Sequence, residues 1–479
     1  MANKKLNNFY SGQQFDDRLP TSSGYSYSEN FKLDDLTKLR ATYGKDPETL
    51  DSEGTFNLMA DDNGVVWRLG IDDGGASRPN NASIDNYTTG WENANTATSG
   101  AITSQTKTMT FYKGGMYFQG LNYLMKFSPP ANTIDTTFQA TTNVVTGRGV
   151  VGKDDVLYFP TDTTLNSYDP NVVPAWVEDV ISVPDDYTIK QIDVFQNLLA
   201  IGVDSNDSRE SGIFLWDYIN ADITDFIPVG VGDLFGLANL NGILIAGLSY
   251  EDKSGQIIEM KGYSGGSPVS LGKIKMNFLD NPEPFKEFQG KIMFSARSSN
   301  TDSLSDARYG IWEFGQVSPQ TPYSFNLLMT DDDWAQDLYD FHQLDDGFLV
   351  AYRGASPGTE YKIDKVYRLG SSAVIETQWF TGNDPTITQQ LISATVLHNP
   401  IPSGGSVTVS VKSDADTSYT TLLVSTTEDS MRTTATFESD GGELDQFLRL
   451  KVKVDTTGGV DVYGIKPEFD AITDDAYGR

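Results

Sequence analysis

The side chains that could perform acid-base chemistry are unevenly distributed in this sequence. The chain of 479 residues has 66 aspartates and glutamates, two histidines and no cysteine. Two carboxylates on either side of a glycosidic bond can hydrolyse it, but nothing in the order of these carboxylates singles out a pair. The histidines, His342 and His398, stand far apart at expected strand ends, so we interpret both as structural.

Motifs for other kinds of chemistry do not occur. The sequence has no P-loop and no dinucleotide-binding GxGxxG, and no serine lies in a nucleophile elbow. Sialidase-like propellers carry a Ser-x-Asp-x-Gly-x-Thr-Trp box. The nearest stretch, Ser83-Ile84-Asp85 with Gly90-Trp91, has its glycine misplaced by three positions. The sequence therefore predicts no catalytic residue, no cofactor-binding residue and no enzymatic activity.

Two acidic loops could offer oxygen ligands to a hard cation such as calcium. The first contains Asp204, Asn206 and Asp207, and the second runs from Asp331 to Asp333. Calcium loops of the EF-hand type need a DxDxDG order, which is missing in both. We interpret them as solvated loops and predict no metal site, with calcium or receptor binding by loops left open.

The elements that would position any site are short strands in a repeating module. Residues 192–218 contain an apolar strand, a turn at Gln196-Asn197, a second apolar strand, a polar loop and a third strand with Phe214 and Trp216. Apolar runs bounded by turn formers are typical of β-strands. Seven stretches share this pattern, and their turns end at Gly64, Gly115, Asp155, Asn197, Gly242, Gly290 and Gly347.

The spacing of these turns predicts the architecture. Periods of roughly 40–50 residues with several strands each are the signature of a β-propeller, in which every blade covers its neighbour's apolar face. Helical solenoids have similar periods, but these units break at Gly, Asn and Asp instead of running amphipathic for a dozen residues. We predict an all-β fold with a seven-bladed propeller over residues 51–370. Six blades are the alternative, because the first module is weak.

Three aromatic residues recur at similar places in the modules: Trp216, Trp312 and Tyr367. They could provide stacking platforms for sugars. Repeated placement in a propeller instead favours packing between blades, because each blade must cover the next. We therefore predict that they belong to the inter-blade core.

The two ends of the chain differ from the repeats. Residues 1–50 are polar with scattered aromatics, and such a segment buries too little apolar area to order itself. We expect an extended arm that packs along the propeller or a neighbouring subunit. Residues 371–479 alternate apolar and polar at 406–411 and 448–454. Short alternating strands predict a C-terminal antiparallel β-sandwich, immunoglobulin-like or jelly-roll.

Charge and hydropathy limit the partners. The chain has 35 Lys and Arg against 66 Asp and Glu, a net charge of −31. No basic cluster is present to grip a phosphate backbone, so the acidic surface either keeps the protein solvated or lets nucleic acid slide past. No apolar run approaches the ~20 residues of a membrane span, and the N-terminus does not read as a secretory signal. We expect synthesis in the cytoplasm, or export by a route without such a signal.

Several stretches together resemble one class of viral protein. They are residues 23–40 (SGYSYSENFKLDDLTKLR), 195–203 (FQNLLAIGV), 288–296 (FQGKIMFSA) and 378–396 (QWFTGNDPTITQQLISATV). Their layout is similar to virion proteins of tailed bacteriophages, such as the nozzle or tail-closure proteins of short-tailed phages. The resemblance implies a structural tail or neck subunit that is assembled in the host cytoplasm. It would form a homo-oligomeric ring around the DNA exit channel with other virion proteins, and passing DNA would make no sequence-specific contact.

Two other functions are compatible with the sequence. The chain could be a tail adhesin whose sandwich or propeller loops hold a receptor or host surface glycan, because loops on a rigid scaffold often carry binding. A glycan-degrading enzyme with carboxylates in the central funnel is the third reading. The absence of a recognisable carboxylate pair disfavours that enzyme.

Overall fold

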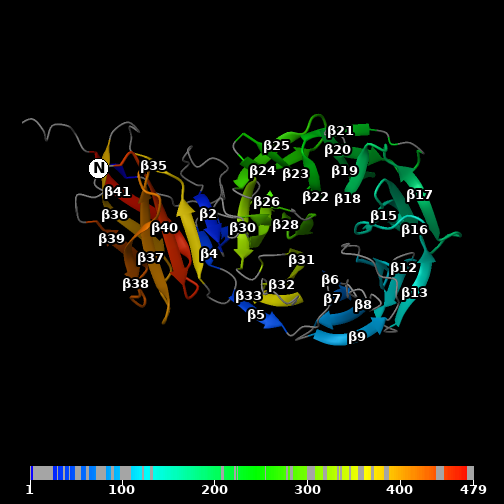
Figure 1. The fold of residues 1–479 in the computed structure, drawn as a ribbon, viewed down its shortest axis with the longest axis horizontal. Coiled ribbons are helices and arrows are strands. Elements are labelled where there is room, and N and C mark those ends of the chain that lie inside the picture. The colour runs from blue at the N-terminus through cyan, green and yellow to red at the C-terminus, as the bar shows by residue number, and fades with distance from the viewer. Residues whose placement is uncertain are drawn as a thin grey trace, which may run out of the picture.

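The computed structural model shows an almost entirely β-stranded protein (Figure 1). The part of the chain that it describes comprises residues 2–3, 25–29, 31–35, 38–41, 44–48, 55–60, 64–71, 82–87, 91–97, 109–120, 123–129, 133–206, 210–220, 223, 225–253, 255–276, 279–280, 284–298, 308–316, 321–331, 334, 337–344, 347–353, 361–367, 372–381, 388–437 and 447–471. No helix in these ranges has the length and apolar character to cross a membrane.

Seven antiparallel sheets are arranged radially as the blades of a propeller (Figure 1). Blade 1 consists of β6 (Thr55–Ala60), β7 (Val66–Ile71), β8 (Ala82–Tyr87) and β9 (Trp91–Ala97). Blade 2 consists of β10 (Thr110–Tyr112), β11 (Gly115–Gln119), β12 (Tyr123–Ser128) and β13 (Thr133–Ala140). Blade 3 consists of β14 (Val150–Val151), β15 (Leu157–Pro160), β16 (Thr164–Tyr168) and β17 (Trp176–Ser182). The first strand of each blade lies near the axis and the last at the rim.

The remaining blades follow the same order. Blade 4 consists of β18 (Tyr187–Phe195), β19 (Leu198–Ser205), β20 (Glu210–Trp216) and β21 (Asp225–Val231). Blade 5 consists of β22 (Asp233–Leu240), β23 (Ile243–Asp252), β24 (Gly255–Tyr263) and β25 (Val269–Met276). Blade 6 consists of β26 (Leu279–Asp280), β27 (Lys286–Phe288), β28 (Lys291–Ser298), β29 (Arg308–Gly315) and β30 (Ser324–Thr330). Blade 7 consists of β31 (Asp337–Gln343), β32 (Gly347–Arg353), β33 (Tyr361–Tyr367) and β5 (Gly44–Glu48). The prediction of a seven-bladed propeller is confirmed.

The predicted turns join the first and second strand of each blade. At Asn241-Gly242 the φ angles are 53° and 80°, which is the backbone of the type I′ turn favoured in two-residue hairpins. In blade 2 the turn lies one residue earlier than predicted, at Lys113-Gly114, and Gly115 begins β11. In blades 1 to 6, residues with positive φ therefore mark the same place in the module, and their spacing revealed the repeat. In blade 7, Gly347 begins β32, and residues 345 and 346 lie outside the described residues.

The last blade is completed by an N-terminal strand. In β5, Gly44 pairs with Tyr367 and Glu48 pairs with Ile363, so β5 is the outer strand of the blade that otherwise runs from 337 to 367. The propeller therefore includes residues ahead of the predicted limit at 51. Because the closing strand comes from the opposite end of the repeat, opening the ring requires breaking a sheet.

The core lies between the blades. Trp216 of blade 4 is 5% exposed and meets Tyr158 of blade 3 edge to face, with ring centroids 5.6 Å apart. Trp312 of blade 6 is 2% exposed and packs in a cluster that also holds Phe235 and Ile245 of blade 5. These two aromatic residues occupy the inter-blade core, as predicted. The side chain of Tyr367 lies outside the described residues.

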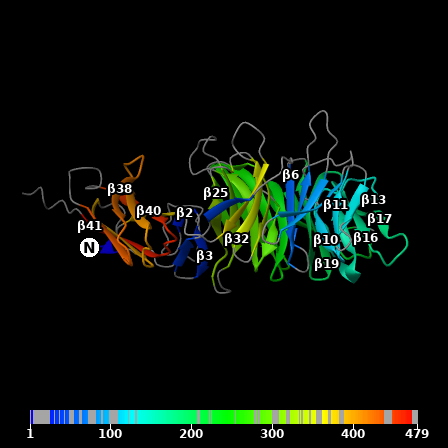
Figure 2. The ribbon, with the colours of Figure 1, turned by 90° about the horizontal axis from the view of Figure 1, so that it is seen from below.

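Two further sheets of six strands stand beside the propeller (Figures 1 and 2). One contains β1 (Ala2–Asn3), β3 (Phe31–Asp35), β4 (Lys38–Ala41), β36 (Gln389–His398), β39 (Arg432–Thr436) and β41 (Val462–Ala471). The other contains β2 (Tyr25–Glu29), β34 (Ala373–Thr377), β35 (Phe380–Thr381), β37 (Ser406–Ser413), β38 (Thr420–Ser425) and β40 (Arg449–Thr457). Both sheets thus take strands from the N-terminal segment that was expected to form an arm.

The alternating valines of the C-terminal region face one shared core. Val407, Val409 and Val411 of β37 are fully buried, together with residues of β36 and β41 in the other sheet. Period-2 alternation puts these side chains on one face of the strand. The immunoglobulin-like or jelly-roll topology stays a prediction. Strands β2 and β3 contact β30, the outer strand of blade 6, and so join these sheets to the propeller.

Candidate functional site

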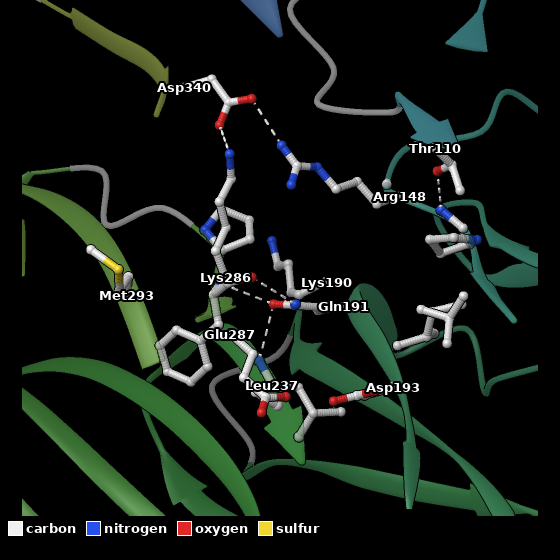
Figure 3. Close-up of a pocket in the computed structure, with 18 of the residues that line it drawn as sticks. Thr110, Arg148, Lys190, Gln191, Asp193, Leu237, Lys286, Glu287, Met293 and Asp340 are labelled. Atoms are coloured by element: carbon white, nitrogen blue, oxygen red, sulfur yellow. Dashed lines mark hydrogen bonds and ion pairs between the residues drawn. The ribbon is translucent and has the colours of Figure 1, made fainter. Parts of the chain in front are cut away.

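A cavity of about 540 Å³ lies at the propeller axis, where the inner strands of blades 2 to 7 converge (Figure 3). Its walls combine apolar side chains, such as Phe111, Phe288 and Met293, with charged groups. Concave sites of this size with a few placed polar groups are typical of small-ligand pockets. The cavity is therefore the candidate functional site of the described chain.

A three-residue ion bridge crosses one side of the cavity. Asp340 of β31 is 1% exposed and receives a 2.8 Å ion pair from Arg148 Nη2. Its other carboxylate oxygen accepts Lys286 Nζ, which also donates to the carbonyl of Phe341. Arg148 precedes β14 of blade 3 and Lys286 belongs to β27 of blade 6, so the bridge links three blades. A bulge at Leu338/Asp340 interrupts the β31 ladder here, and such bulges re-aim side chains.

His342 also lines the cavity. Burial lowers its pKa to about 4, and the positive charges of Lys286 and Arg148 act in the same direction, against Asp340. His342 is therefore neutral at pH 7. The other histidine, His398, is buried in β36, where its ring nitrogens bond the Asn399 carbonyl at 2.7 Å and Thr433 Oγ1 at 2.9 Å.

Gln191 of β18 fixes three blades together below the bridge. Its Oε1 accepts the backbone N–H of Leu237 at 3.1 Å and of Phe285 at 3.2 Å, and its Nε2 donates to the Phe285 carbonyl at 3.1 Å. These contacts join blades 4, 5 and 6. Because the site is built on strands held by such bonds, its geometry is preorganised.

Two carboxylates lie on the opposite side from the bridge (Figure 3). Asp193 of β18 accepts backbone N–H groups from Asn239 at 2.6 Å and Val194 at 2.7 Å, yet burial raises its pKa. Burial also raises the pKa of Glu287 in β27, and the charge of Asp193 adds to this. Within the described residues, the Glu287 carboxylate has no hydrogen-bond or ion-pair partner. Such a group can bind a hydroxyl of a ligand.

The acidic loops do not form a cation site in the parts described. Asp204 Oδ1 accepts Ser211 Oγ at 2.8 Å, while Asp204 Oδ2 lies 3.6 Å from Lys190 Nζ. Asn206 Oδ1 instead accepts Thr188 Oγ1 at 2.9 Å. Residues 207, 332 and 333 lie outside the described residues. Among the residues that the structure describes, no group of three histidines or carboxylates could hold a metal ion.

Comparison with known proteins gives similarity of fold only. No family model and no curated protein matches the chain. The Dos1 propeller is similar over 67% of this chain and 95% of its own, with 11% identity and a TM-score of 0.42. The propeller domain of Myceliophteria thermophila Cps50 (Swd1) covers 67% of this chain and 99% of its own, with 11% identity and a TM-score of 0.42. A Trypanosoma rangeli sialidase covers 92% of this chain and 94% of its own, with 9% identity and a TM-score of 0.33. No activity follows from fold alone.

The sequence analysis predicted no catalytic, cofactor-binding or metal site, and it interpreted His342, which lines the cavity, as structural. The cavity is lined mainly by the inner strands that begin the modules. One signal was present: Arg148, Asp340 and Lys286 are charged residues in or next to strands with buried neighbours. Charged side chains are rarely buried unless paired, so their positions on inner strands indicate pairing across the axis.

Proposed function

We propose that this chain is a structural virion protein of a tailed bacteriophage, a nozzle-like tail or neck subunit that works in a homo-oligomeric ring. The observation that supports this most is the closure of the fold. Strand β5 seals the propeller, and strands from both ends of the chain share the sheets beside it. A subunit with both ends fixed in sheets keeps its shape when neighbours pull on it.

The charge of the subunit suits a place beside a DNA channel. A net charge of −31 repels phosphate, and a protein that binds DNA needs Lys and Arg to replace counterions. In the proposed ring, DNA passes without sequence-specific contact, and the partners are other tail and neck proteins. The ring assembles in the host cytoplasm as part of the virion.

The proposed role is not enzymatic. In the cavity, Asp340 is neutralised by two cations, and Asp193 accepts two backbone N–H groups. Glu287 is then the remaining carboxylate of the described lining. Most glycosidases use two carboxyl groups with complementary roles, and in this cavity Glu287 is the one carboxylate of the described lining without a described partner.

Mass spectrometry of purified phage particles tests the proposal. We expect the chain in intact particles, and gold-labelled antibodies against it should mark the tail or neck in electron micrographs. Negative-stain images of the recombinant protein with its neighbouring tail proteins should show rings. If mass spectrometry does not detect the protein in purified particles, the structural role is refuted.

A second function is favoured by one observation. Arg148 lines the axial cavity and donates one hydrogen bond to Asp340. Its other N–H groups can bind a ligand, which favours a receptor- or glycan-binding tail adhesin. A glycan array with the recombinant protein tests the adhesin role: binding to a host surface glycan supports it, and the absence of such binding opposes it.

A further inference from the structure

We propose that the axial cavity binds a small acidic sugar, such as a hexuronate, whose carboxylate pairs with Arg148 and whose hydroxyl groups contact Glu287 and Asp193. This site is independent of the structural role proposed above. The argument depends on the geometry and charge of the described cavity lining.

The guanidinium of Arg148 has donors to spare. Its side chain is 26% exposed. Among the described residues, it makes one ion pair, in which Nη2 also donates a hydrogen bond to Asp340. A guanidinium has five N–H donors in a planar fork that matches a carboxylate. The fork of Arg148 therefore can hold Asp340 and a ligand carboxylate at once.

The charge balance at the bridge favours an anion. Arg148 and Lys286 both pair with the single carboxylate of Asp340, so two cations of the bridge stand beside one carboxylate at the cavity wall. His342 adds no positive charge, since burial holds its pKa near 4. Lys190, which is 40% exposed, also lines the cavity, and its partner Asp204 lies at 3.6 Å. An anionic ligand on this side can pair with the N–H donors of Arg148 that Asp340 does not use.

The opposite side selects a ligand that is anionic only at one end. Figure 3 shows Glu287 and Asp193 across the cavity from Asp340 and Arg148. Two carboxyl groups there repel a second negative charge but bind hydroxyl groups well, either as acceptors or, when protonated, as donors. A compact dianion such as phosphate fits this gradient less well than a sugar acid.

The size and walls of the cavity agree with a sugar. About 540 Å³ lies within the range of small-molecule sites and admits a monosaccharide. Phe111, Phe288 and Leu237 line it and offer apolar surface to the C–H faces of a ring. The Gln191 bonds between blades hold these walls in place without a ligand.

Isothermal titration calorimetry of the full chain with D-glucuronate, D-glucose and inorganic phosphate tests the site. We expect glucuronate to bind with a Kd on the order of 1 mM or below, and glucose and phosphate to bind at least about tenfold more weakly because each lacks half of the required chemistry. No heat with glucuronate overturns the proposal. Glucose binding equal to glucuronate, or phosphate binding as tightly, overturns the assigned ligand class.

Two variants assign the binding to this cavity. Arg148→Lys keeps the charge but loses the planar fork, and Glu287→Gln changes a side chain without a described partner, so its fold is not at risk. Each should weaken glucuronate binding at least about tenfold, and Glu287→Gln should also bring phosphate binding closer to that of glucuronate. The control Asp155→Asn, at an exposed ion pair with Lys113, should leave binding unchanged. Unaltered affinity in both cavity variants overturns the site.

Discussion

Replacing Asp340 by Asn should destabilise the propeller more than any other single change in the axial bridge. The substitution keeps the shape of the side chain and removes the charge that Arg148 and Lys286 share. Removing one partner of a buried pair costs about 3–5 kcal/mol, because the other charge stays buried and unpaired. The side chains of Lys286 and Arg148 are 16% and 26% exposed to solvent, so water compensates in part. We expect a loss near the lower limit, about 3 kcal/mol.

Arg148→Met should cost less. In that variant Asp340 still pairs with Lys286, so the loss is one charge-assisted hydrogen bond, worth about 1.5–3 kcal/mol. The double variant Asp340→Asn/Arg148→Met should lose less stability than the sum of the single variants, since it removes an unpaired cation along with the carboxylate. The expected order of destabilisation is therefore Asp340→Asn first, Arg148→Met second.

Urea unfolding followed by circular dichroism and tryptophan fluorescence measures these losses. Trp216 and Trp312 lie between blades, so their emission reports on the propeller. Asp155→Asn is the control, because its carboxylate is 63% exposed and exposed ion pairs contribute little. The reasoning is refuted if Asp340→Asn unfolds at the same urea concentration as this control, or if Arg148→Met is the more damaging change.

Three further changes test other parts of the account. Burial lowers the pKa of His342 from 6.5 to about 4 in the folded chain, so the unfolded chain takes up this proton first as the pH falls. The free energy of unfolding should therefore decrease by up to about 3 kcal/mol between pH 6.5 and pH 4. A His342→Gln variant should show a smaller loss in urea titrations across that range. Gly247→Ala places a methyl group 2.5 Å from Phe285 Cζ and should cost about 1–3 kcal/mol through overpacking, measured the same way. Deleting residues 1–48 removes β5 from the edge of β33 and β1 to β4 from the two further sheets, so size-exclusion chromatography should show aggregates, whereas deleting residues 1–24, which among the described strands removes β1 alone, should leave a single peak.

The blade count could be predicted because its signal is local. In blades 1 to 6 the first hairpin has residues with positive φ, such as Asn241-Gly242, and the following strand is apolar because neighbouring blades cover its faces. Both properties are encoded within a dozen residues. Six modules also follow one another in sequence, so their spacing could be measured directly.

The role of the N-terminal segment could not be predicted in the same way. Its strands are polar, and β5 includes Pro47, which sequence rules confine to edge positions. Here β5 is an edge strand, at the rim of blade 7. Its identity as a strand depends on β33, more than 300 residues away in the sequence, and no local pattern reports such a partner.

The axial site shows the same limit more clearly. Arg148 and Asp340 are separated by 192 positions in the sequence, and each alone resembles an ordinary surface charge. They become a bridge only after the ring closes, because closure brings residues of blades 3 and 7 together at one cavity. The charges that define the site therefore depend on the sealing strand β5 as much as on the residues themselves. If the ring opens, Asp340 loses Arg148, and the guanidinium that would bind a sugar acid is no longer held at the cavity. Any variant that detaches β5 from blade 7 should consequently lose both the closed ring and the ability to bind the ligand.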